Sequence, residues 1–192
     1  MGNQAHRPAL ILIRHAAPAQ DPNVPPPQWS LSEDGRAAAR ALAAKLKHLP
    51  PAAVVSSPEI KALETVTLLT EGLGLQVETD PAFAELHRPK WPFSDTATFE
   101  ARVVRLLENP HLSIEGAEPA GEAAARFSEG LFRHAARPLM VGTHGTILAA
   151  YLGLQTGRHD AELWKSLRLP EALVLDAESR LIERISLYVE LR

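Results

Sequence analysis

The chain of 192 residues contains no cysteine. This absence excludes disulfide bonds, zinc sites built on cysteine and thiol nucleophiles. No apolar run approaches the roughly 20 residues that a helix needs to cross a bilayer. The polar start of the chain, Met1 to Pro8, also lacks the apolar stretch and the small-residue cleavage site of a signal peptide. We therefore expect a cytoplasmic protein without membrane contacts.

The chain also lacks an excess of positive charge, with 20 Lys+Arg against 23 Asp+Glu. This balance excludes a strongly basic nucleic-acid binder, although it is compatible with a local basic pocket. The hydrophobic share of 45% is ordinary for a globular protein, and the length suffices for a core without disulfides or metal. No boundary divides the chain, so we expect one domain over 1–192 with a small cap at about 81–118.

What the sequence does contain is an alternation of short apolar runs and longer amphipathic stretches. Apolar runs at 9–13, 52–55, 76–79 and 139–142 predict buried strands. Helices are expected at about 32–49, 57–72, 98–108, 118–136 and 146–152, and a strand pair near the sheet edge at 172–176 and 181–187. This βαβ alternation predicts an α/β fold with a mostly parallel sheet.

Local signals place the helix starts and the loops. Ser32 is a candidate N-cap, as is Ser57, with Pro58 at the first helical position. The proline-rich loop, DPNVPPP at 21–27, is expected to be stiff and extended, neither helix nor central strand. The irregular segment 81–98 is expected to form a lid or a pocket wall.

Polar clusters follow all four of the predicted parallel strands. Arg14-His15 follows the first strand, Ser56 to Lys61 the second, Glu85 lies beyond the third, and Thr143-His144-Gly145 follows the fourth. In open α/β sheets the functional crevice lies outside the carboxyl ends of the strands. The sequence therefore predicts that two histidines, two cations and a carboxylate converge there.

These clusters carry a resemblance to a known family. Six short motifs carry the resemblance and follow one another along the chain. In order, they are Leu12-Ile13-Arg14-His15-Ala16, Leu31-Ser32-Glu33-Asp34-Gly35, Ser56-Ser57-Pro58-Glu59-Ile60-Lys61-Ala62 with Glu64-Thr65, Glu85-Leu86, Pro119-Ala120-Gly121-Glu122 and Val141-Gly142-Thr143-His144-Gly145. The ordered set resembles the histidine phosphatase superfamily, also called phosphoglycerate mutase-like. The resemblance implies a three-layer α/β/α sandwich around a mostly parallel sheet.

The resemblance also implies roles for the catalytic candidates. His15 would be the nucleophile, and Arg14 would grip the phosphate oxygens with its planar fork. His144 would donate to the transferring group, while Glu85 would protonate the leaving alkoxide and then activate water. Cationic side chains would replace a metal ion, so no metal and no cofactor is expected. The candidate substrate-binding residues are Lys61, Asn23, Arg88 and Gly145.

Departures from the family pattern leave alternatives open. Ala16 stands where the family usually has glycine, and Lys61 stands where it has arginine, which removes the bidentate fork. Lys61 could equally be an exposed helix residue, and Arg88 a solvated loop charge. Glu85 could be paired with the cations of its own loop. Asn23 lies farther along the chain than the family's asparagine.

The length of the cap separates the candidate activities. About 40 residues lie between Glu85 and the helix near Arg126, a modest cap for a mutase that must shield a phosphohistidine. Hydrolysis of a small phosphomonoester, with a small phosphorylated metabolite as partner, is therefore favoured. Phosphoglycerate mutase-type transfer and a non-catalytic module that binds phosphate esters are the alternatives. Neither a GxGxxG motif after the first strand nor a P-loop motif is present.

Overall fold

The computed structural model describes residues 7–159 and 161–187. Its elements are β1 (Leu10–Arg14), η1 (Pro26–Gln28), α1 (Glu33–Leu46), β2 (Ala53–Ser56), α2 (Ile60–Leu69), β3 (Val77–Thr79), η2 (Pro81–Phe83), α3 (Thr96–Glu108), α4 (Ala120–Arg133), β4 (Leu139–Thr143), α5 (Gly145–Thr156), α6 (Glu162–Ser166), β5 (Glu171–Leu175) and β6 (Leu181–Ser186). Helices η1 and η2 are 3-10 turns.

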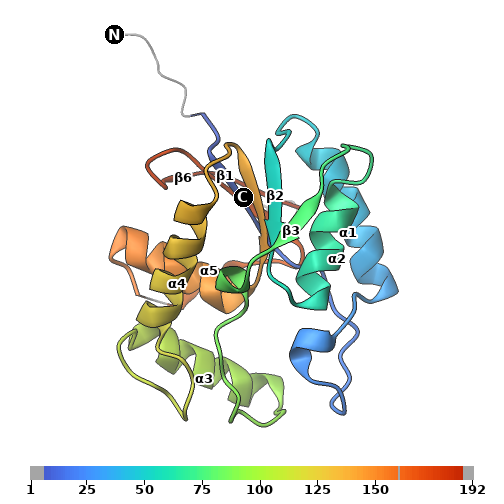
Figure 1. Cartoon of the computed structure of the whole chain (residues 1–192). Helices are drawn as coiled ribbons and strands as arrows, with labels where there is room; N and C mark the ends of the chain where they lie inside the picture. The colour runs from blue at the N-terminus through green and yellow to red at the C-terminus, as the bar shows by residue number, and fades with distance from the viewer. Residues whose placement is uncertain (1–6, 160, 188–192) are drawn as a thin grey trace.

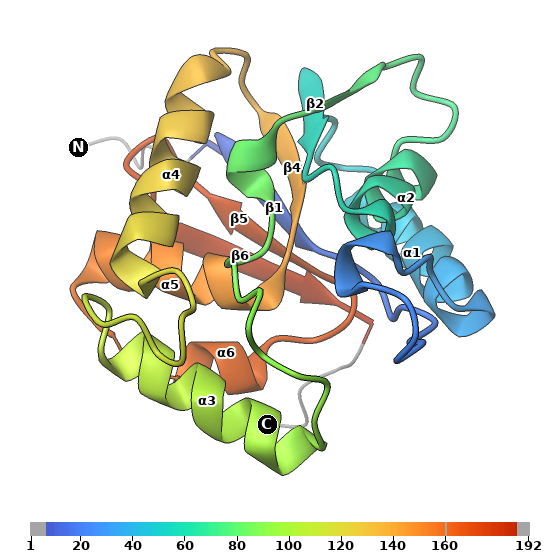
Figure 2. The same cartoon turned by 60° about the horizontal axis from the view of Figure 1, so that its bottom comes forward.

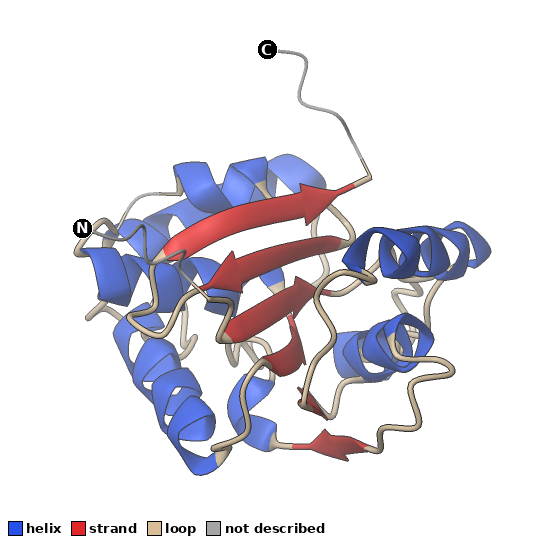
Figure 3. Cartoon of the chain, turned by 90° about the horizontal axis from the view of Figure 1, so that it is seen from above, coloured by secondary structure: helices blue, strands red, loops and turns tan. Residues whose placement is uncertain are grey.

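The six strands form one sheet in the order β3-β2-β4-β1-β5-β6. The first four in this order are mutually parallel, whereas β5 runs antiparallel to β1 and β6 antiparallel to β5. Figure 3 shows the sheet from above with helices around it. The predicted mostly parallel sheet is confirmed, as is the strand pair, whose second member forms one edge.

Side-chain alternation along β1 divides the core into two layers. Leu10 and Leu12 pack with residues of α3, α4 and α5, while Ile11 and Ile13 pack with residues of α1 and α2. Successive strand residues point to opposite faces, so an apolar strand needs helices on both sides. Figure 1 shows α1 and α2 on one side of the sheet and α4 and α5 on the other. The three-layer sandwich is confirmed.

Several predicted boundaries differ from the structure. Pro26–Gln28 form a 3-10 turn inside the loop that we expected to be extended, because the fixed φ of proline also suits such a turn. Ser32 does cap α1, its hydroxyl accepting from the Gly35 amide at 3.0 Å. Ser57 does not cap α2, which begins at Ile60 after Glu59.

Other differences lie in the second half of the chain. Helix α4 ends three residues earlier than expected, and α5 continues to Thr156, where Gly157 takes a left-handed conformation. The single turn of α6 is too short to give a periodic pattern, and the sequence did not predict it. Over 7–159 and 161–187, no helix combines the length and the apolar character needed to span a membrane.

Candidate active site

Two histidines meet at the carboxyl ends of neighbouring parallel strands. His15 follows β1, and its amide donates to the Thr143 carbonyl at 3.0 Å, which extends the β1–β4 pairing. His144 follows β4, and the two imidazole rings lie edge to face with centroids 5.1 Å apart. The predicted convergence of these two motifs is therefore confirmed.

The His15 ring has one nitrogen fixed and one free. Nδ1 lies 2.8 Å from the Ala16 carbonyl oxygen, which can only accept, so Nδ1 carries the hydrogen. Nε2 then keeps its lone pair and has no hydrogen-bond partner among the described residues. Burial lowers the pKa of His15 well below its usual value, and His144 lowers it further. A neutral imidazole with a free nitrogen is the form that can act as a nucleophile.

The backbone after the first histidine is held from two helices. The Ala16 amide donates to the Thr65 hydroxyl at 3.0 Å, and the Ser32 hydroxyl donates to the Ala17 carbonyl at 3.1 Å. A Cβ at Gly35 would lie 2.1 Å from that same carbonyl oxygen. Only glycine allows α1 to approach so closely. The Leu-Ser-x-x-Gly motif thus holds the backbone that follows the first histidine.

His144 is fully buried at the start of α5. Its Nε2 lies 2.8 Å from the Ser57 hydroxyl and 3.4 Å from Oε1 of Glu59. Its Nδ1 is buried and has no hydrogen-bond partner in the described part of the chain. Burial lowers the pKa of His144 to about 3; Glu85 opposes this shift and nearby cations reinforce it. The ring is therefore neutral at neutral pH.

Glu85 lies against the N-terminus of α5. Its Oε1 accepts from the Ile147 amide at 3.0 Å and its Oε2 from the Thr146 amide at 3.2 Å, which suits an anion at a helix N-terminus. Arg88 Nη1 lies 3.9 Å from Oε2. Burial raises the pKa of Glu85, but Arg88, the second histidine and backbone amides lower it to about 2. Glu85 is thus ionised near neutral pH and partly paired, as the alternative interpretation expected.

Arg14 packs onto the start of α5. Its Nη1 donates to the Leu167 carbonyl at 2.7 Å, while its Nε is buried without a hydrogen-bond partner among the described residues. A Cβ at Gly145 would lie 2.9 Å from that Nε. Gly145 therefore leaves room for the guanidinium, which explains the glycine after the second histidine.

The two other candidate cations, Lys61 and Arg88, make specific contacts inside the protein. Lys61 is only 6% exposed, and its Nζ lies 2.5 Å from Oε2 of Glu59 and 2.9 Å from the Pro26 carbonyl. The alternative of an exposed helix lysine is therefore wrong. Arg88 lies over the Phe99 ring at 5.1 Å, and its Nη1 is buried without a hydrogen-bond partner among residues 7–159 and 161–187.

Asn23 contacts neither histidine among the described residues. It is exposed, and its side-chain nitrogen donates to the Asp21 carboxylate at 3.1 Å. Conversely, sequence reasoning did not select Ser57, Glu59 or Thr65 as site residues, although all three contact the motif residues. The available signal was their place in the Ser-Ser-Pro motif, where Glu59 occupies one of the unspecified positions.

Two loops flank the site. The proline-rich loop is joined to α2 by the Lys61 contact, and segment 84–95 runs from η2 past the start of α5 to α3, as Figure 2 shows. The loops meet where the Trp29 and Phe93 rings lie edge to face, 6.5 Å between centroids. Trp29 is held by its Nε1 donating to the Val24 carbonyl at 2.9 Å.

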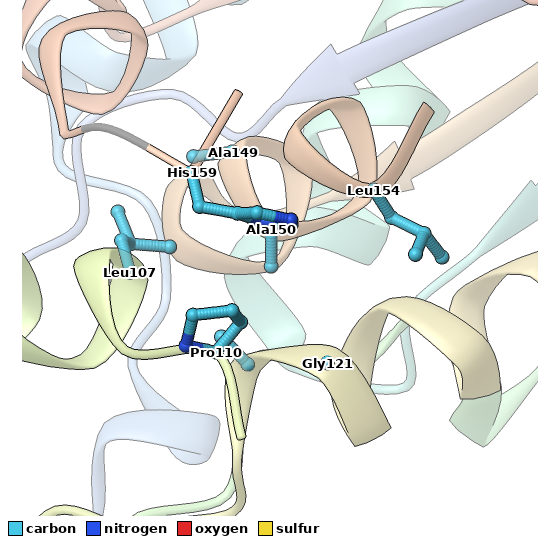
Figure 4. A pocket seen from close by; sticks show the side chains of 8 residues that line it. Leu107, Pro110, Gly121, Ala149, Ala150, Leu154 and His159 are labelled. Carbon is cyan, nitrogen blue, oxygen red and sulfur yellow. The ribbon is translucent and has the colours of Figure 1, made fainter. Parts of the chain in front are cut away.

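A separate small pocket lies between α3, α4 and α5 (Figure 4). Its lining is mainly apolar, and the one ionisable side chain there belongs to His159. Within the described ranges, no group of three or more histidine, aspartate or glutamate side chains could hold a metal ion. The histidine pair at the carboxyl ends of β1 and β4, with the free Nε2 of His15, is the candidate active site.

Comparisons with known proteins show which family and which solved structures the chain resembles. A sequence model of the histidine phosphatase superfamily (branch 1) matches residues 10–176. No curated protein sequence matches the chain. The native structure of mycobacterial glucosyl-3-phosphoglycerate phosphatase is similar with a TM-score of 0.71 and 25% identity, over 92% of this chain and 97% of that one.

Two further solved structures show the same likeness. The VO3 complex of the same mycobacterial phosphatase gives a TM-score of 0.67 and 26% identity, over 87% of this chain and 92% of that one. Bacillus stearothermophilus YhfR gives a TM-score of 0.68 and 22% identity, over 90% of this chain and 94% of that one. The latter likeness concerns the fold.

Proposed function

The chain belongs to the histidine phosphatase superfamily, and on that premise we propose that it hydrolyses a small phosphomonoester through a phosphohistidine on His15. The observation that carries this proposal is the state of the His15 ring. Its Nδ1 is committed to the Ala16 carbonyl, and its Nε2 is free beside His144. That is the tautomer a nucleophilic imidazole requires.

In the first step, the Nε2 lone pair of His15 attacks phosphorus, and the bond from phosphorus to the ester oxygen breaks. Two buried donors without partners among the described residues, Arg14 Nε and Arg88 Nη1, are available for phosphoryl oxygens, and His144 Nδ1 becomes a third donor once the ring carries a second proton. Donors placed where charge develops stabilise the transition state without reorganisation. These cations supply the charge neutralisation that a metal ion supplies in other phosphoryl transfers.

In the second step, water attacks phosphorus, the N–P bond breaks, and the electron pair returns to Nε2. Glu85 is ionised, so it can accept the proton of that water. Its role as acid in the first step requires that it first gains a proton. A negative charge about 4 Å away at an effective dielectric of about 20 raises a carboxyl pKa by about 3, so the bound ester itself favours protonation.

The neighbouring structures support phosphatase activity over transfer between substrates. A mycobacterial glucosyl-3-phosphoglycerate phosphatase matches 92% of this chain. The segment between Glu85 and α4 here holds one helix, α3, in agreement with a modest cap. Glucosyl-3-phosphoglycerate is therefore one substrate to test.

The proposal is tested by phosphate release from a panel of esters with a chelator present. The panel includes glucosyl-3-phosphoglycerate, 3-phosphoglycerate, a sugar phosphate and a nucleotide. We expect sustained release by the native chain, none by His15→Ala, and native rates from the control His111→Ala, an exposed histidine outside the site. Transfer of phosphate between substrates without net release would instead indicate a mutase. Ester binding without turnover would indicate a non-catalytic module.

A further inference from the structure

Glu59 is a buried carboxylate that the proposed reaction does not use. It is 8% exposed and precedes α2 as its N-cap residue. Its Oε1 accepts from the Glu85 amide at 2.9 Å and lies 3.4 Å from His144 Nε2. Its Oε2 lies 2.5 Å from Lys61 Nζ. One carboxylate thus touches the second histidine, the motif lysine and the backbone of the proposed acid.

We propose that Glu59 is a positioning residue that holds His144 as a proton-carrying donor when a tetrahedral oxyanion binds. The inference rests on the proposed function of this site. The substrate's phosphoryl group would be contacted by His144 and not by Glu59, which acts from the opposite side of the ring.

The hydrogen-bond geometry assigns the two sides of the ring. An ionised carboxylate can only accept, so Glu59 favours a hydrogen on His144 Nε2, with Ser57 Oγ at 2.8 Å as its nearest acceptor. The neutral ring then has no hydrogen on Nδ1. Nδ1 is the buried atom without a partner in the described part of the chain, and it can donate to an oxyanion only after it takes up a proton. A carboxylate behind the ring stabilises the resulting imidazolium, as in other His–carboxylate pairs.

The charges around His144 explain why the proton arrives with the anion. The charged and titratable groups that face it come from β1, α2 and the loop after η2, namely Arg14, His15, Glu59, Lys61, Glu85 and Arg88. Without an anion, the three cations outnumber the two carboxylates and oppose an imidazolium. A bound dianion reverses this balance, and Glu59 then lies on the side away from the anion.

The proposed test measures protons taken up when tungstate binds. Tungstate is a tetrahedral dianion that remains unprotonated near neutral pH, so any uptake belongs to the protein. Titration calorimetry in buffers of different ionisation enthalpy gives the number of protons. At about pH 8 Glu85 stays ionised even when a bound anion raises its pKa by about 3 from about 2. At this pH we expect about one proton per tungstate for the native chain and close to none for Glu59→Gln. Tungstate affinity above neutral pH should fall about tenfold per pH unit in the native chain and change little in the variant.

Glu64→Gln is the matched control, because Glu64 lies in α2, the helix that Glu59 precedes, and holds Arg36 and the Leu31 amide outside the site. It should keep the native uptake. Should Glu59→Gln fail to fold because Lys61 loses its partner, the double variant Glu59→Gln/Lys61→Met removes both charges together. It should also take up close to no protons.

Each outcome decides the inference. If a folded variant without Glu59 takes up as many protons as the native chain, the inference is overturned. Tungstate binding to the native chain without proton uptake overturns it as well. Neither result affects the proposed hydrolysis, which the ester panel tests separately. No tungstate binding by the native chain would contradict both proposals. Loss of uptake confined to the Glu59 variants supports the role assigned to Glu59.

Discussion

Two groups of charged side chains, one at the active-site edge and one around Asp80 between β3 and η2, differ in how completely they are paired. Asp80 accepts from the Ala82 amide at 2.8 Å, from Arg133 Nη2 at 2.9 Å and from His134 Nε2 at 3.1 Å. At the active site, by contrast, lie three of the four buried side-chain atoms that have no hydrogen-bond partner among the described residues, namely Arg14 Nε, Arg88 Nη1 and His144 Nδ1. The fourth atom, Ser56 Oγ, is packed beside Gly142 and α2.

This difference separates groups that stabilise the fold from groups that await a ligand. A partly exposed ion pair such as Asp80–Arg133 contributes up to about 1 kcal/mol to stability, whereas a buried polar atom without a partner costs about 1–3 kcal/mol. A fold retains such atoms where function requires them. Substitutions in the two regions should therefore have opposite consequences.

The largest contrast is expected between two arginines. Arg14→Ala should lower kcat by roughly 10³–10⁵-fold, the range for removal of an arginine that stabilises phosphoryl transfer. Arg133→Ala should leave turnover per folded molecule within about twofold and lower stability by about 1 kcal/mol, because its side chain is half exposed. Ester kinetics and urea unfolding of both variants provide the measurement. A similar loss of turnover in both variants would remove the distinction.

A smaller loss of activity is expected from one added methyl group. In Gly145→Ala the new Cβ would lie 2.9 Å from Arg14 Nε, so the guanidinium must move. Displacement of a positioned group by about 1 Å typically costs about 10²-fold in rate. Gly157→Ala is the control on the same helix, since its Cβ meets no atom within 4 Å and its positive φ affects only stability. Unchanged kcat in Gly145→Ala would show that Arg14 does not need its present position.

The buried histidines predict how stability depends on pH. In the unfolded chain a histidine takes up a proton below about pH 6.5, whereas burial holds the pKa of His144 in the folded protein at about 3. Between these values the unfolded state binds more protons, so stability falls as pH falls, by about 1.4 kcal/mol per pH unit for each such histidine. His144→Asn should reduce the slope by that amount. An unchanged slope in urea unfolding at several pH values would contradict the neutral buried ring.

The smallest effect is expected for Asn23→Ala. Its side chain is exposed and bonds Asp21, so kcat and KM should stay within about twofold of the native values. A tenfold rise in KM, measured with the same esters, would show that the proline-rich loop moves to bring Asn23 to the substrate.

The sheet and the meeting of the histidines could be predicted because each depends on local signals. Apolar runs such as Leu10–Ile13 end in polar residues, and parallel strands bring those ends together. The motifs then identified His15, His144 and Glu85, and the structure brings all three to one edge.

What the sequence did not predict depends on contacts between distant segments. Lys61 pairs with Glu59 and with the Pro26 carbonyl because the proline-rich loop packs on α2. The hydrophobic periodicity of the sequence cannot predict such a contact. The capping of α5 by Glu85 joins residues about 60 apart in sequence. Asn23 was selected only because it follows the first histidine in the chain. The family pattern gave no sign that its side chain would instead bond to Asp21 within the same loop.

The central claim, that His15 is the nucleophile, is tested most directly by trapping the phosphorylated protein. A reaction with an active ester is quenched rapidly in alkali, in which phosphohistidine survives, and the peptides are analysed by mass spectrometry. The account predicts one phosphoryl group on the peptide that contains His15, formed before free phosphate accumulates and absent from His15→Ala. Phosphate release without that modification, or with the phosphoryl group on another residue, would contradict it.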